Sequence, residues 1–167
     1  MKKITFSLLA LLTLCSLVAS AQDPAVAALK AEHIKVVLVK EIENITDSTK
    51  HHTHHEPHRS NHKIIHVTLD ISKNPEYTGV VKGKKSVIML LTDSHGLVIS
   101  EAEAGGGIYM LDGKETHFTL RHMIEFDGST YKLDFLYKNP HRFHKGTHVL
   151  SFYSDGIKIG EEHFIID

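Results

Sequence analysis

A histidine-rich segment carries the strongest chemical character in this sequence. Between Lys50 and Lys63 the chain reads HHTHHEPHRSNH, so half of this stretch is histidine. Imidazole is the commonest protein ligand for borderline transition metals, and its charge changes near neutral pH. The predicted ligands for Zn²⁺, Cu²⁺ or Ni²⁺ are the histidines of this stretch, the carboxylate among them and the next histidine along the chain: His51, His52, His54, His55, Glu56, His58, His62 and His66.

The spacing of these histidines allows several ligand sets. His51, His54 and His55 would share one face if the segment became helical on binding, whereas His52 and His54 project to the same side of an extended chain. A flexible site must order as it binds, so we expect modest affinity. Two alternatives stay open: the histidines respond to pH, or they are incidental to a solvated linker, because any such cluster binds nickel or zinc.

Other candidate residues are weaker. His141, His144 and His148 would form a site only if their loops converge. Asp93, Ser94 and His95 are consecutive residues of a predicted turn, whereas a catalytic triad converges from separate segments. The chain also lacks a Gly-x-Ser-x-Gly elbow, a His-Glu-x-x-His helix and a phosphate-binding loop. The sequence therefore predicts that the protein is not an enzyme and requires no cofactor.

The first 21 residues have the pattern of a signal peptide. Lys2 and Lys3 precede a mostly apolar run, Ile4–Val18, and small residues follow up to Ala21. We expect cleavage after Ala21, export to the periplasm, the cell surface or the medium of a Gram-negative bacterium, and no membrane span after cleavage.

The single cysteine, Cys15, lies within this predicted signal peptide. Leu14 stands before it, where a lipoprotein signal needs a small residue, so lipidation is disfavoured. Residues 22–167 contain no cysteine, which excludes disulfides, a thiol nucleophile and a zinc–thiolate site. The formal net charge is −1, and no basic field argues for a nucleic-acid partner.

A helix is predicted next, within a helical segment spanning residues 22–46. Asp23 followed by Pro24 is a good helix start, and apolar residues recur at steps of three and four up to Ile45. Against this, Ile34–Val39 is rich in β-branched residues and suits a buried strand. Residues 47–62 are polar and aperiodic, and are predicted to be a histidine-rich linker.

From residue 63 the apolar period changes to two. Ile65–Ile71, Tyr131–Tyr137 and His148–Phe152 alternate as half-buried strands, whereas Ser86–Thr92 is almost wholly apolar, as in a strand covered on both faces. Asx-Gly turns separate such segments. About seven or eight short strands are expected, which predicts an all-β domain over residues 63–167, an antiparallel β-sandwich.

The segment Lys145–Gly156 resembles the last hairpin of many Ig-like modules, in which a tyrosine hydroxyl ties the corner. His148 stands at the matching position, where a ring N–H would replace that bond. More specifically, Lys85–Gly96, Gly107–Lys114 and Tyr153–Gly160 resemble the C-terminal Ig-like module of uncharacterised exported bacterial envelope proteins, in which a helical segment often comes first. The resemblance covers residues 63–167 and implies a fold, with no catalytic residues.

Together these features predict an exported binding module of the bacterial envelope whose histidine-rich segment coordinates a divalent metal ion. The alternative is a protein–protein interaction or assembly module with an envelope protein as its partner, in which the histidines are incidental.

Overall fold

The computed structural model describes residues 26–40, 60, 62–111 and 113–167, and this part of the chain is all-β with antiparallel pairing. The predicted fold class is confirmed at this level. The described residues form ten strands and one short 3-10 helix, η1 (Ala102–Ala104), but no α-helix. The strands are β1 (Leu29–Lys40), β2 (His62–Lys73), β3 (Gly83–Thr92), β4 (Val98–Ile99), β5 (Gly107–Leu111), β6 (Lys114–Phe118), β7 (Leu120–Phe126), β8 (Tyr131–Lys138), β9 (Gly146–Ser154) and β10 (Ile157–Ile166).

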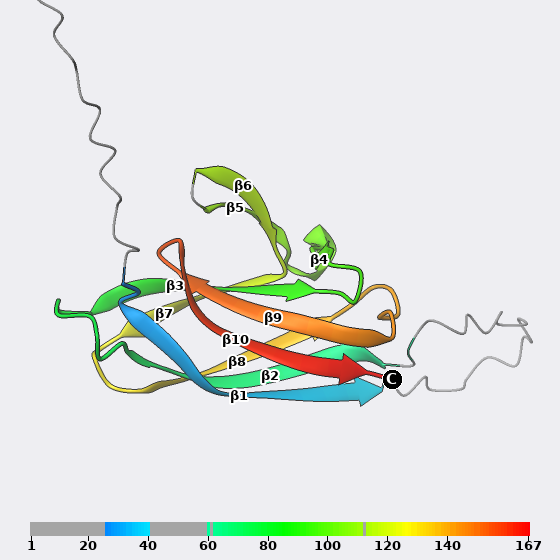
Figure 1. The fold of residues 1–167 in the computed structure, drawn as a ribbon, viewed down its shortest axis with the longest axis horizontal. Coiled ribbons are helices and arrows are strands. Elements are labelled where there is room, and N and C mark those ends of the chain that lie inside the picture. Colours follow the sequence, from blue (N-terminus) through cyan, green and yellow to red (C-terminus); the bar gives the residue numbers. More distant parts are fainter. Residues whose placement is uncertain (1–25, 41–59, 61, 112) are drawn as a thin grey trace, which may run out of the picture.

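The helix predicted over Pro24–Ile45 is wrong for Leu29–Lys40, which is strand β1. β1 pairs with β2, which pairs with β8, to form a three-stranded sheet (Figure 1). The β-branched run that begins at Ile34 decides the outcome, because its backbone finds partners in β2 that the sequence does not reveal. The folded unit thus includes β1, although the sequence predicted that it begins at residue 63.

A β-bulge in β1 explains why its apolar residues looked helical. Glu32 is the register partner of Asp70 and Lys35 that of Thr68, so His33 and Ile34 together lie opposite one residue of β2. His33 has a positive φ of 51°. Before the bulge Ala31 faces the core, and Ile34 is the next residue that does so. The extra residue thus replaces one step of two residues by a step of three, which is a helical spacing.

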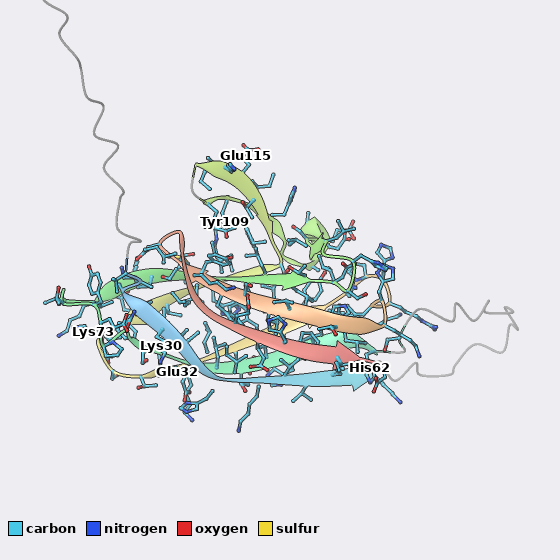
Figure 2. All side chains as sticks on the ribbon, viewed as in Figure 1. Lys30, Glu32, His62, Lys73, Tyr109 and Glu115 are labelled. Atoms are coloured by element: carbon cyan, nitrogen blue, oxygen red, sulfur yellow. The ribbon has the colours of Figure 1, made fainter. Side chains whose placement is uncertain are left out.

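The second sheet has the order β10-β9-β3, and β3 also pairs with β4 and β7. As predicted, β3 is covered on both faces. Val87, Met89 and Leu91 face the first sheet and belong to the main core, whereas Ile88 and Leu90 face the β5–β6 hairpin. Tyr109 of this hairpin packs over the sheet (Figure 2).

The two larger sheets share one core. Buried residues such as Ile65 and Val67 of β2 and Phe135 of β8 belong to the same cluster as Phe152 of β9 and Phe126 of β7. Residues of both sheets therefore pack in one hydrophobic cluster. In the part of the chain described, no helix is long and apolar enough to cross a membrane.

Candidate functional site

The histidine-rich segment connects two paired strands. Lys40 at the end of β1 is the register partner of His62 at the start of β2. The two strand ends that flank residues 41–61 therefore lie side by side, near the end of β10 and the C-terminus (Figure 1). The segment is a connection within the folded unit, whereas the sequence predicted a linker between a helix and a domain. We call this part of the molecule the loop end.

Ser60 and His62 join the start of β2 to the β8–β9 connection. The Ser60 N–H donates to the Phe143 carbonyl at 2.8 Å, and the Ser60 hydroxyl lies 2.9 Å from His62 Nδ1. Ser60 is buried, whereas His62 is half-buried and stands at the loop end (Figure 2). The neighbouring Asn139 N–H donates to the Lys63 carbonyl at 2.8 Å. These bonds hold Asn139 and Phe143 beside the start of β2.

His144 and His95 meet at the same end of the fold. His144 Nδ1 lies 3.2 Å from the Asp93 carboxylate, and the rings of His95 and His144 contact edge to face with centroids 4.8 Å apart. Asp93 also accepts the N–H groups of His95 and Leu97, each at 2.9 Å. Burial would raise the pKa of the Asp93 carboxyl, but these hydrogen bonds outweigh it and hold that pKa below its ordinary value.

This contact was not predicted, because Asp93 and His144 lie 51 residues apart in sequence. The predicted turn from Asp93 is confirmed, since its N–H donates to the Leu97 carbonyl and its carbonyl accepts from Gly96. A hollow of about 230 Å³ opens between this turn and the β8–β9 connection, and His141 and His144 both line it. Two of the three histidines in the His141–His148 motif therefore share one hollow.

The third, His148, lies in the core beneath them. Its side chain has no exposed surface and packs against the rings of Phe143 and Phe164. Its Nδ1–H donates to the Gly146 carbonyl at 3.1 Å, so the expected ring N–H bond to the backbone is present. Nε2 is buried and has no hydrogen-bond partner among the described residues. Burial lowers the pKa of His148, against the opposing effects of the Gly146 carbonyl and of Asp93.

The predicted metal ligands are only partly described by the structure. His51, His52, His54, His55, Glu56 and His58 lie outside the described residues. His66 stands four positions along β2 from His62, about 13 Å at the usual rise per residue, and its Nε2 lies 2.5 Å from the Asp134 carboxylate. Within the ranges that the structure describes, no three histidine, cysteine, aspartate or glutamate residues are grouped to hold a metal ion.

Comparisons with known proteins define a family and little else. Residues 34–167 match the family described as a domain of unknown function, DUF8428. A search of curated proteins found no match. Among solved structures, the chain is similar to Pseudomonas fluorescens alkylpurine DNA glycosylase AlkC bound to DNA containing an abasic site analog. That similarity has a TM-score of 0.46 and 14% identity, and it covers 86% of this chain but 31% of the glycosylase chain.

Proposed function

The chain belongs to the DUF8428 family, and we propose that it is an exported, non-enzymatic binding module of the bacterial envelope. In this proposal the connection between β1 and β2 coordinates Zn²⁺, Cu²⁺ or Ni²⁺ through its histidines. The observation that supports it is the pairing of Lys40 with His62, which fixes both ends of the histidine-rich connection at one end of the fold. His141 and His144 line a hollow at that same end.

The proposed site binds a metal ion and catalyses no reaction. Neutral imidazole is the ligand for these metals, so bound metal competes with protons and affinity falls as the pH drops through the histidine range. Fixed ends reduce the number of conformations that the connection must give up on binding. The folded domain thereby favours a site that a free peptide of the same sequence would form less readily.

We also propose that the two larger sheets form an Ig-like β-sandwich. Their shared core and antiparallel pairing support this architecture. The hydrogen bond from the His148 ring to the Gly146 carbonyl supports it further, because a side chain at the corresponding corner of Ig-like modules also bonds to nearby backbone. Binding loops at one end of such a sandwich are a common way to present a site on a rigid scaffold.

Calorimetric titration of residues 22–167 with zinc, copper and nickel tests the metal proposal. The test variant replaces all six histidines of the 51–62 stretch with glutamine. The control variant carries the same replacement at three exposed histidines elsewhere, namely His33, His117 and His163. We expect submicromolar binding that the control retains and the six-histidine variant loses, with unchanged circular dichroism. Micromolar or weaker binding by the unaltered protein would overturn metal handling as its function.

A second candidate function, assembly with an envelope protein, is favoured by a different observation. Val37 and Leu136 expose 53% and 63% of their surface on the outer side of the three-stranded sheet, away from the core. Co-purification of a specific envelope partner that withstands a chelator would support this function. A protein that stays monomeric and partnerless would count against it.

A further inference from the structure

The outer face of the β1-β2-β8 sheet exposes apolar side chains in register. Val37 of β1, His66 of β2 and Leu136 of β8 are consecutive register partners, so they form one row across the sheet. Val39 follows in the next outward position of β1 and is 39% exposed. Val37 and Leu136 therefore lie in one row on the two outer strands, with His66 between them. Apolar side chains scattered singly on a surface need no explanation, whereas these two share a row.

Charged side chains on the two outer strands of this sheet alternate in opposite order. In one row Lys35 of β1 and Asp134 of β8 flank Thr68. In the next row away from the loop end, Glu32 of β1 and Lys132 of β8 flank Asp70. The cation is thus on β1 in the first row and on β8 in the second.

We propose that this face binds the same face of a second copy of the chain, about a two-fold axis that runs parallel to β2 between the two sheets. Rotation about that axis exchanges β1 with β8 and keeps each row in place. Val37 then lies over Leu136 of the second copy, and Lys35 lies over its Asp134. Each of these contacts occurs twice, as an isologous interface requires.

The same rotation also places Glu32 over Lys132 of the second copy. Glu32 already accepts from Lys30 at 2.7 Å and from the Ser72 hydroxyl at 3.2 Å, so it contributes less than Lys35. Asp134 accepts from His66 of its own sheet and keeps a second carboxylate oxygen for Lys35 of the other copy. In the outer strands every flanking residue meets its opposite or an apolar side chain. In the central strand each residue lies over its own copy, so Asp70 faces Asp70, and in each copy His33 Nδ1 lies 3.1 Å from this carboxylate.

The size of the face sets the expected strength. Three strands about 4.8 Å apart and rows that span about eight residues give a projected area of roughly 15 by 25 Å. Part of this area is a hollow of about 360 Å³, which Lys35 and Asp134 help to line. The projected area is below the roughly 800 Å² per partner of a standard stable interface. We therefore expect a weak dimer that dissociates on dilution.

Sedimentation equilibrium of residues 22–167 across a wide concentration range, in the presence of a chelator, tests the proposal. The chelator removes metal bridging between histidine-rich connections, so the failure of this proposal and the failure of the metal proposal are distinguishable. Leu136→Asp should abolish the dimer. Met123→Asp should leave it intact, because Met123 is also 63% exposed but lies on β7 of the other sheet.

Charge reversal tests the proposed axis. Lys35→Glu should weaken dimerisation by at least about fivefold, since it alters two symmetric pairs, and adding Asp134→Lys should recover it. A protein that is monomeric throughout, equal effects of the Leu136 and Met123 variants, or a dimer indifferent to Lys35→Glu would each overturn the proposal.

Cysteine crosslinking provides a measurement that does not depend on destabilising variants. Residues 22–167 contain no cysteine, so new thiols report on single positions. A mixture of the Val37→Cys and Leu136→Cys proteins should form a disulfide-linked dimer under mild oxidation. A mixture of Val37→Cys and Met123→Cys should not, and equal crosslinking in both mixtures would contradict the proposed contact.

Discussion

Lys40 and His62 are register partners at the end of the β1–β2 pair, and the histidine-rich stretch of the sequence lies between them. The stretch that the sequence predicted to be a linker therefore connects two paired strands, and its two ends lie side by side. These ends are held further by the Ser60 N–H, which donates to the Phe143 carbonyl at 2.8 Å. A connection with fixed ends has fewer conformations to lose, so under the proposed metal binding the folded domain would raise the affinity.

The fixed ends of the connection predict that the protein binds metal more tightly than the isolated segment. A synthetic peptide of residues 47–62 carries the same histidines without the fixed ends. We expect its affinity for zinc to be about fivefold to tenfold weaker than that of residues 22–167, because it must lose more conformational freedom. Calorimetry at one pH measures both. A peptide with glutamine in place of histidine is the control, and equal affinities of peptide and protein would contradict a role for the fold.

His148 predicts a dependence of stability on pH. Its folded-state pKa is lowered by burial, so the unfolded chain takes up a proton first as the pH falls below the ordinary value of 6.5. The contribution of His148 is thus complete above that pH and is lost on acidification towards its folded pKa. The charged groups that act on the ring are Asp93, His95 and His144.

We expect the loss of unfolding free energy between pH 7.5 and pH 5 to be smaller in His148→Phe than in the unaltered protein. Urea denaturation at both pH values measures the difference, whatever the variant loses at pH 7.5 through the missing bond to Gly146. His163→Phe is the control, since that ring is exposed. The same pH slope in the protein and the His148 variant would rule out this histidine as the source.

The close approach of β10 to β1 at Gly160 leaves no room for a larger residue there. A Cβ at Gly160 would lie 2.8 Å from the Ala31 Cβ and 3.0 Å from its carbonyl oxygen. Gly160→Ala should therefore destabilise the fold by about 1–3 kcal/mol, as overpacking does. Ala31→Gly removes one of the two clashing atoms, so the double variant should lose less than the sum of the single losses. Strict additivity in denaturation experiments would contradict this packing.

Loss of the Thr119 hydroxyl should lower the free energy of unfolding by a large amount. The Thr119 side chain is fully buried, donates to the Ile99 carbonyl at 2.6 Å and accepts the Leu91 N–H at 2.8 Å. Thr119→Val keeps the shape but leaves both backbone groups without this partner, which should cost about 2 kcal/mol or more. Thr116→Val is the matched control, expected within about 0.5 kcal/mol. Thermal or urea denaturation compares the two, and equal effects would refute the assignment.

Most strands were predictable because the alternation of apolar and polar residues indicates which side chains are buried. Ile65, Val67, Leu69 and Ile71 alternate with polar residues, and the structure buries all four in β2. The apolar run of β3 likewise indicated a strand covered on both faces. β1 was not predictable in the same way, because the bulge at His33 breaks its two-residue period and the remaining spacing imitates a helix.

The sequence by itself determined the all-β class, most of the strands and the histidine-rich composition of one connection, because alternation and turn residues are local signals. Only the tertiary structure decided that β1 is a strand, that Lys40 meets His62, and that His144 reaches Asp93. Each of these depends on backbone or side-chain partners that lie 20 or more residues away. Their pairing energy is realised only when the sheets assemble, so no local pattern encodes it.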